Sequence, residues 1–228
     1  MTTIIKTENL WKTYGEGGLR QVDAVKGISL DIEKGAVTAL GGPSGSGKTT
    51  VLSIVGLLTR PTRGNVYLEE QELSNLSEVF RTRIRREKIG FIFQAQYLIP
   101  QLTAFENVAL PMLCTDMSRT EAEGLAREKL SEMGMGHRLD FRVAELSGGE
   151  QQRVSIARAL IGSPDILIAD EPSSSIDEEL TLELLDIIRS MVDNEGLTAV
   201  VASHDPIVLK WADHLFQMRN GELERKHD

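Results

Sequence analysis

The sequence predicts an α/β fold in which buried parallel strands alternate with helices. Between residues 36 and 55, a short apolar run, a glycine-rich turn and a helical pattern follow one another. Two further apolar runs of strand length, residues 166–169 and 198–203, are each followed by a helical pattern. Strands that are buried on both faces read as continuous apolar runs, and their alternation with helices is typical of a parallel sheet.

Length and composition are those of an ordinary globular protein. The 228 residues allow one large domain or two modest ones, with 41% hydrophobic and 26% charged residues. The N-terminus lacks the layout of a secretory signal, and no apolar run approaches the roughly 20 residues of a membrane span, so we expect a cytoplasmic protein. A formal net charge of −9 argues against nucleic acid as a partner. The single cysteine, Cys114, excludes an internal disulfide and is expected to serve packing.

Two strands are expected ahead of the glycine-rich turn. Residues 4–13 mix apolar and polar side chains, and the apolar residues Ile28, Leu30 and Ile32 alternate with polar ones, as in half-buried strands. Tyr14 follows the first strand. An aromatic residue there suits stacking on a base, but an ordinary tyrosine at a strand end fits the pattern equally well.

Residues 42–49 have the pattern of a phosphate-binding loop: glycine, four residues, glycine, lysine, then serine or threonine. Glycines let the backbone turn its N–H groups toward phosphate oxygens, and the N-terminus of the next helix adds a positive end. Lys48 can reach the outer phosphates, and the Thr49 hydroxyl suits a magnesium ion bound to them. The predicted nucleoside triphosphate ligands are Gly42, Pro43, Ser44, Gly45, Ser46, Gly47, Lys48, Thr49 and Thr50.

The middle of the chain predicts a strand at 65–68, a helix at 77–88 and a buried strand at 89–93 that ends at Gln94. A polar amide at the mouth of a buried strand suits a ligand or metal contact. The helix is rich in arginine and lysine, and we favour a solvated helix face over contact with anionic lipid or an acidic partner. Residues 100–136 then read as a small helical insert.

Ser147 and Glu150 have the spacing of a capping box ahead of the helical run 154–161. Gly148 and Gly149 lie between them and leave the backbone N–H groups of the helix start exposed. Such an end attracts anions. A simple helix start would leave the paired glycines unexplained, because glycine costs a helix interior about 1 kcal/mol relative to alanine.

Polar residues follow two of the buried strands at their carboxyl ends. Asp170 is suited to hold magnesium, and Glu171 is placed to polarise a water for attack on the terminal phosphate, an assistance worth ~10²–10⁴ in rate. His204 ends the strand 198–203 on the same expected sheet edge, which favours a functional role over a packed or surface one. A closing hairpin is expected around the turn 220–221.

These segments together resemble the nucleotide-binding subunit of ABC transporters over essentially the whole chain. The matched motifs are the Walker A loop at Gly42–Thr49, the Q-loop at Gln94, the signature at Leu146–Gln151 with Glu150 in place of glutamine, the Walker B strand at Ile166–Glu171, the A-loop aromatic at Tyr14, the D-loop at Ser173–Asp177 and the switch histidine at His204. The stretch from Phe91 to Val108 is most similar to the LolD, MacB and FtsE branch.

The resemblance implies the ABC ATPase fold over residues 1–228: a RecA-like P-loop NTPase core with an antiparallel β subdomain, and an inserted α-helical subdomain. Residues 1–94 and 162–228 would form the core and β subdomain, and residues 95–161 the helical subdomain with the signature. Two departures stand out. Ser173 opens the D-loop where this branch more often has threonine, and the turn at residues 69–70 lacks the glycine often found there.

The resemblance also implies a mechanism shared between two copies that face each other head to tail, with ATP and Mg²⁺ as cofactors. One copy would contribute the catalytic groups Glu171, His204, Lys48 and Gln94, and the magnesium ligands Thr49, Gln94 and Asp170, while the other would cap the γ-phosphate with Ser147, Gly148 and Gly149. Hydrolysis would reopen the pair and drive a separate integral membrane permease, on the inner face of the plasma membrane. A periplasmic adaptor is a further partner that the branch allows.

The sequence leaves two alternative functions open. An FtsE-like regulatory cassette that signals through a membrane partner cannot be separated from a transporter subunit by sequence. A soluble ABC ATPase of DNA repair or translation fits less well, because the chain has no heptad run, no cysteine pair and a single phosphate loop.

Overall fold

A computed structural model describes residues 2–15, 21–174 and 176–224, and its strands form two sheets. An antiparallel sheet has the order β2-β1-β4-β5, with β1 at Thr3–Tyr14, β2 at Val22–Glu33, β4 at Arg63–Leu68 and β5 at Gln71–Glu72. The second sheet has the order β10-β9-β3-β8-β7-β6, with β3 at Val37–Gly41, β6 at Ile89–Ile92, β7 at Ile166–Asp170, β8 at Thr198–Ala202, β9 at His214–Arg219 and β10 at Glu222–Leu223.

The second sheet is parallel except at its last hairpin. β3 pairs in parallel with β8 and β9, and β7 pairs in parallel with β6 and β8. β10 then folds back antiparallel to β9, as the predicted closing hairpin requires. The carboxyl ends of β3, β6, β7 and β8 therefore open at one edge, which is where parallel sheets bind ligands.

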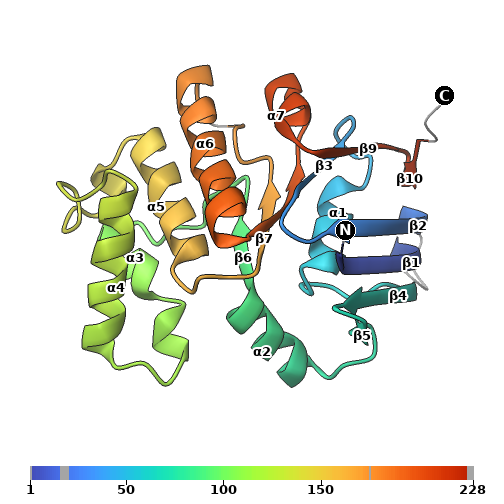
Figure 1. Ribbon diagram of the computed structural model, residues 1–228, viewed down its shortest axis with the longest axis horizontal. Coiled ribbons are helices and arrows are strands. Elements are labelled where there is room, and N and C mark those ends of the chain that lie inside the picture. The colour runs from blue at the N-terminus through green and yellow to red at the C-terminus, as the bar shows by residue number, and fades with distance from the viewer. Residues whose placement is uncertain (1, 16–20, 175, 225–228) are drawn as a thin grey trace.

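The helices fall into two groups. α1 (Lys48–Val55), α6 (Glu178–Glu195) and α7 (Pro206–Trp211) follow strands of the parallel sheet, while α2 (Glu78–Lys88) precedes β6. The inserted helices are α3 (Ala104–Ala109), α4 (Arg119–Glu132) and α5 (Gly148–Leu160), with short 3-10 turns at Met112–Cys114 and Val143–Glu145. In Figure 1 the inserted helices lie on one side of the parallel sheet and the antiparallel sheet on the other. The expected layout of a parallel core, an antiparallel β subdomain and an inserted helical subdomain is confirmed, and the subdomain limits at 94 and 162 stay a prediction.

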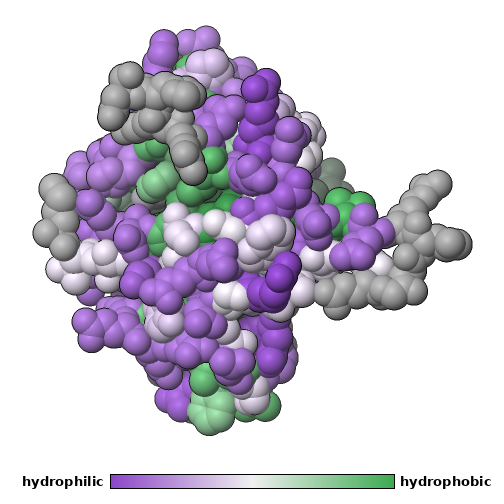
Figure 2. Space-filling view, turned by 90° about the vertical axis from the view of Figure 1, so that its right-hand side faces the viewer, coloured by the Kyte–Doolittle hydropathy of each residue, from purple (hydrophilic) through white to green (hydrophobic). Residues whose placement is uncertain are grey.

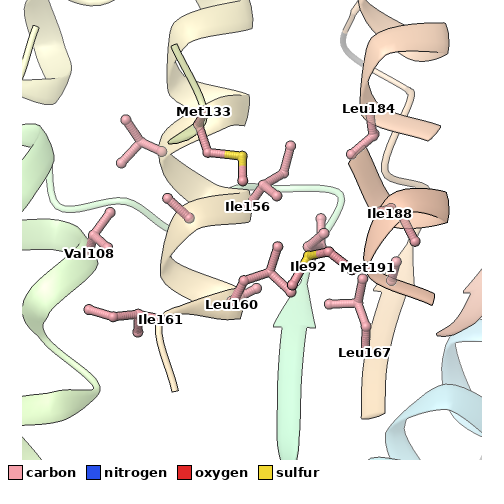
Figure 3. Close-up of a cluster of buried hydrophobic side chains, with 14 of the residues drawn as sticks. Ile92, Val108, Met133, Ile156, Leu160, Ile161, Leu167, Leu184, Ile188 and Met191 are labelled. Atoms are coloured by element: carbon pink, nitrogen blue, oxygen red, sulfur yellow. The ribbon is translucent and has the colours of Figure 1, made fainter. Parts of the chain in front are cut away.

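Two hydrophobic clusters hold the strand that carries the carboxylates. Figure 3 shows the first, in which Ile156 and Leu160 of α5 and Ile188 of α6 pack near Leu167 of β7. The next residue, Ile168, belongs to the second cluster, with α1 and the antiparallel sheet. Each fully buried side chain of this size contributes about 1.5–3 kcal/mol. β7 is therefore anchored on both faces, so the residues at its end have little freedom to move.

The basic helix α2 departs from the expected solvated face. Arg81 is only 3% exposed and donates to the backbone carbonyls of Leu57 (2.7 Å) and Thr59 (2.9 Å), just beyond the end of α1. Arg85 also donates to the Leu57 carbonyl, at 2.6 Å. The prediction was wrong for these two residues because carbonyls after a helix end need donors, and α2 supplies them. Cys114 is exposed, so its predicted packing role was wrong as well.

The unusual turn between β4 and β5 is a two-residue hairpin. Leu68 pairs with Gln71 across it, and both Glu69 (φ 47°) and Glu70 (φ 71°) adopt left-handed backbone conformations. Such turns favour glycine or asparagine. The turn lies at the edge of the antiparallel sheet, away from the edge where the parallel strands open. Figure 2 shows the face of the antiparallel sheet, on which hydrophilic residues dominate and hydrophobic residues form small groups.

Candidate functional site

The loop between β3 and α1 folds around its own lysine. Lys48 is 6% exposed, and its Nζ donates to the carbonyls of Gly42 (2.7 Å) and Pro43 (3.2 Å). Gly47 has φ +103°, and a Cβ there would lie 2.4 Å from the carbonyl oxygen of Ala24, so the position accepts glycine alone. α1 has no side-chain cap and no acidic residue in its first turn. Its first N–H groups are thus available to an anion.

A hollow of about 340 Å³ opens over this loop. Its wall contains Ala24, Ser44, Gly45, Ser46, Gly47, Lys48, Thr49, Thr50, Gln94, Glu171 and His204. The structure therefore brings the phosphate loop together with three predicted residues from other strand ends. Gly42 and Pro43 do not line the hollow, but their carbonyl oxygens accept hydrogen bonds from Lys48, which does. Asp170 lines a neighbouring hollow together with Thr49 and Gln94.

Glu171 has an uncommon backbone conformation at this edge. Its backbone φ is +48°, in the left-handed region that residues other than glycine seldom adopt. Such conformations cluster at functional sites. Its side chain is 12% exposed, with Oε1 3.6 Å from Lys48 Nζ and Oε2 2.9 Å from His204 Nδ1. The Ser203 hydroxyl and the His204 backbone N–H also donate to Oε2, at 3.4 and 3.3 Å. The carboxylate is therefore held beside the lysine and pointed at the hollow.

The Asp170 side chain is only partly satisfied by hydrogen bonds. One carboxylate oxygen, Oδ1, is buried and has no hydrogen-bond partner. Burial raises the pKa of Asp170, and the neighbouring Glu171 adds to this, whereas a hydrogen bond from Thr49 and the charge of Lys48 oppose it. Buried polar atoms are normally paired, and a hard cation suits an orphaned carboxylate oxygen beside a hydroxyl. The residues present therefore fit a magnesium ion.

Oxygen atoms of the nucleotide would have to complete the coordination shell of a magnesium ion at Asp170. Within the ranges that the structure describes, no group of three or more His, Cys, Asp or Glu side chains is arranged to hold a metal. Magnesium commonly takes one or two carboxylates and substrate phosphates rather than an all-protein cage. The arrangement at Asp170 and Thr49 is of that kind.

The start of α5 lies outside the hollow. The Ser147 hydroxyl accepts from the Glu150 N–H (3.3 Å), and the Glu150 carboxylate accepts from the Ser147 N–H (2.8 Å), which confirms the predicted capping box. A Cβ at Gly148 would meet nothing within 4 Å, whereas one at Gly149 would lie 2.7 Å from a methyl of Leu180. One chain thus presents an open helix start that takes no part in the wall of its own phosphate site.

Tyr14 is not brought into the hollow either. It is 46% exposed at the end of β1, and Lys12 Nζ lies 5.1 Å from the centre of its ring. Residues 16–20, which follow it closely in the chain, and Ser175 of the predicted D-loop lie outside the described residues. Base stacking by Tyr14 stays a prediction.

Sequence reasoning missed a polar bridge between the site's loops. Gln152 of α5 is 3% exposed, accepts from Gln96 Nε2 (3.1 Å) and donates to the carbonyl of Pro172 (3.0 Å), the residue after Glu171. Arg158 of the same helix donates to the carbonyl of Tyr97 (2.8 Å). Their positions on the inner side of the helix, in register with apolar residues, were the available signal.

Comparisons with known proteins agree with this geometry. Residues 25–174 match the family model described as ABC transporter. The chain is 42% identical to the "lipoprotein-releasing system ATP-binding protein LolD 2" of Caulobacter vibrioides, over 95% of this chain and 93% of that protein. It is also 42% identical to LolD of Aquifex aeolicus, over 98% and 97%. A solved dimer of the ATP-binding cassette MJ0796, in a post-hydrolysis state bound to ADP and phosphate, is 38% identical with a TM-score of 0.90 and 97% of each chain covered.

In the part of the chain that the structure describes, none of the helices combines the length and the apolar content needed to cross a membrane. The phosphate loop, the two carboxylates at the end of β7, the capped glycine pair and the family match agree with one another. The chain therefore belongs to the ABC transporter family, as an ATP-binding and ATP-hydrolysing subunit of the LolD branch.

Proposed function

We propose that two copies of this chain bind two ATP molecules and magnesium between them, and that hydrolysis drives a membrane protein partner. The observation that carries the proposal is the separation of two half-sites. The phosphate loop, Glu171 and His204 share one hollow, whereas the open start of α5 at Gly148 lies outside it. The solved structures of a cassette with the same fold are dimeric, which supports a pair of copies as the working unit.

In this proposal each group of the site has a separate role. Lys48 leaves its carbonyl partners to bind the outer phosphates, and the N–H groups of the loop and of α1 bind the remaining oxygens. Thr49, Asp170 and Gln94 would hold a magnesium ion, which would neutralise charge on the phosphates. Glu171 orients and deprotonates the attacking water, and His204 contacts the γ-phosphate. Ser147, Gly148 and Gly149 of the second copy cap that phosphate, and Tyr14 stacks on the base.

The partner is proposed to dock beside the helical insert. A hollow of about 510 Å³ there is lined by aromatic and apolar side chains and by arginines, among them Arg85, Phe91, Phe93, Tyr97 and Met112. It lies between α2, β6 and the insert, next to Gln94. Relatives named for a lipoprotein-releasing system support a membrane partner, and therefore a position on the cytoplasmic face of the membrane. Nothing supports a periplasmic adaptor, so the proposal does not include one.

Placing aspartate at position 148 tests the shared site. Because a side chain at Gly148 meets nothing within 4 Å, the Gly148→Asp chain should fold and melt like the wild type. A carboxylate facing the partner's γ-phosphate should nevertheless lower ATP turnover by about 10²-fold or more, through repulsion and loss of N–H contacts. Gly124→Asp, also open to solvent in a helix, is the matched control and should retain turnover. Wild-type turnover by Gly148→Asp would refute the shared site.

Asp170→Asn should separate stability from activity. Because burial raises the pKa of Asp170, the ionised form destabilises the nucleotide-free fold at neutral pH. The asparagine chain should therefore melt at a higher temperature than the wild type near neutral pH, and the difference should shrink as the pH falls and the wild-type carboxyl is protonated. Magnesium-dependent turnover should fall by at least about 10²-fold.

Thermal melts from acid to neutral pH, with an ATPase assay, measure both effects. Asp140→Asn, at an exposed aspartate that pairs with Arg127, is the control and should change neither. An asparagine chain that is less stable at neutral pH, or that keeps its magnesium-dependent turnover, would contradict the assignment of Asp170.

A further inference from the structure

The capping box at the start of α5 uses a charged residue where a neutral one would serve. Glu150 Oε2 accepts the Ser147 N–H at 2.8 Å, and this contact needs an acceptor but no charge. A glutamine side-chain oxygen could make it equally well. The hydrogen bond from Ser147 nevertheless lowers the pKa of Glu150, so the residue is ionised. A negative charge therefore sits at a helix end that the proposed function requires to attract a phosphate.

The charge matters because the helix end is only weakly positive. A helix N-terminus acts as roughly half an elementary positive charge. One carboxylate there would reverse the sign, to roughly half a negative charge, so that the end would repel the triphosphate. Two other charges lie just before the helix, Arg142 and Glu145, and they are of opposite sign and both exposed. Their charges cancel, so they leave the net charge at the helix start unchanged.

Arg138 restores the positive sign. Its Nε lies 3.0 Å from Glu150 Oε1, on the side of the carboxylate that does not face Ser147. The Arg138 side chain is 38% exposed and that of Glu150 is 23% exposed, so water screens the pair only in part. The guanidinium also stacks on the ring of Phe141 at 4.6 Å, which restricts its rotamers. The arginine is therefore held in place beside the carboxylate.

We propose that Arg138 is a positioning residue of the shared nucleotide site: it neutralises Glu150, so that the start of α5 attracts the terminal phosphate of ATP bound by the other copy. The inference rests on the proposed function, because the phosphate belongs to the partner subunit. Arg138 acts through Glu150 and the helix end and does not itself bind the nucleotide.

The test measures the ATP concentration that gives half-maximal dimer formation, by light scattering, in chains that also carry Glu171→Gln to prevent turnover. Arg138→Gln should raise this concentration about 3- to 20-fold at low salt, the range expected for one charge at a partly buried helix end. The factor should shrink between about 0.05 M and about 0.5 M NaCl, since salt screens the repulsion. Arg138→Lys, which keeps the charge, should stay close to the parent.

Removing the Glu150 carboxylate should compensate for the loss of the Arg138 charge. The Arg138→Gln/Glu150→Gln chain should return to the parent concentration, and Glu150→Gln alone should fall below it. If Arg138 only braced the fold, the defect would be insensitive to salt and would persist in the double variant. Arg127→Gln removes another arginine of the insert that is both stacked and ion-paired, and as the control it should leave the concentration unchanged.

Three results would overturn the inference: an unchanged concentration for Arg138→Gln, a defect that high salt leaves intact, or a double variant as impaired as the single one. Should Arg138→Gln fail to fold, Glu150→Gln alone decides, and a concentration at or above the parent would refute the proposal. Gly148→Asp, run alongside, tests the shared site itself. If it blocks dimer formation while Arg138→Gln does not, this inference fails and the proposed function stands.

Discussion

Replacing Glu171 with glutamine is expected to lower ATP turnover by about 10²–10⁴-fold while ATP binding is retained. The substitution removes the proton acceptor and changes little else. Glutamine has the same shape, its oxygen can still accept from the Ser203 hydroxyl and the His204 N–H, and the left-handed backbone at position 171 is unaltered. Lys48 loses a charged neighbour 3.6 Å away but keeps its two carbonyl partners.

The same variant should accumulate as an ATP-bound dimer, because the nucleotide that joins the two copies is not consumed. Size-exclusion chromatography with light scattering should show a dimer with ATP and magnesium, and a monomer with ADP. Glu195→Gln, an exposed residue at the end of α6, is the control and should behave as the wild type. Near-wild-type turnover by Glu171→Gln would remove the carboxylate from the mechanism. A nucleotide-bound structure with the start of α5 turned away from every phosphate would exclude the shared site.

The sequence was sufficient for the architecture because three strands of the parallel sheet, β3, β7 and β8, are almost wholly apolar. The runs at β3, β7 and β8 are buried on both faces, so periodicity and length alone identify them. The phosphate loop could be predicted for a different reason. Its glycines are required by local backbone geometry, as the 2.4 Å approach at Gly47 illustrates, and local geometry is written in local sequence.

The contacts that complete the site join residues far apart in the chain, and local patterns do not encode them. Arg81 is buried against carbonyls beyond the end of α1, and this depends on where α2 packs. The sequence does not show that packing, so the arginine-rich helix was predicted to be solvated. The bridge from Gln96 through Gln152 to Pro172 joins three segments. The left-handed backbone of Glu171 cannot be deduced from a residue type that rarely adopts it. The motifs identified which residues matter, and packing determined how they are held.

Lys48→Met should weaken nucleotide binding strongly, in contrast to Glu171→Gln. Methionine fills nearly the same volume but supplies no charge to the phosphates and no donor to the carbonyls of Gly42 and Pro43. It also leaves Glu171 Oε1 without its cation. Turnover should fall by about 10³-fold, with an increase in the ATP dissociation constant of at least about 10²-fold, because a desolvated phosphate contact to a charged group is lost.

The stability of the nucleotide-free Lys48→Met chain should fall as well, by about 1–3 kcal/mol, because buried acceptors are left unpaired. Calorimetric titration with ATP and thermal melts measure the two effects. Lys129→Met is the matched control, since Lys129 is 14% exposed and paired with Glu132 but lies in the helical insert. The two site variants should therefore stop at different steps. Glu171→Gln should bind ATP and dimerise without hydrolysing it, whereas Lys48→Met should remain a monomer at ATP concentrations that saturate the wild type. A Lys48→Met chain that still forms the ATP-dependent dimer would show that the phosphate contacts of the loop do not hold the two copies together.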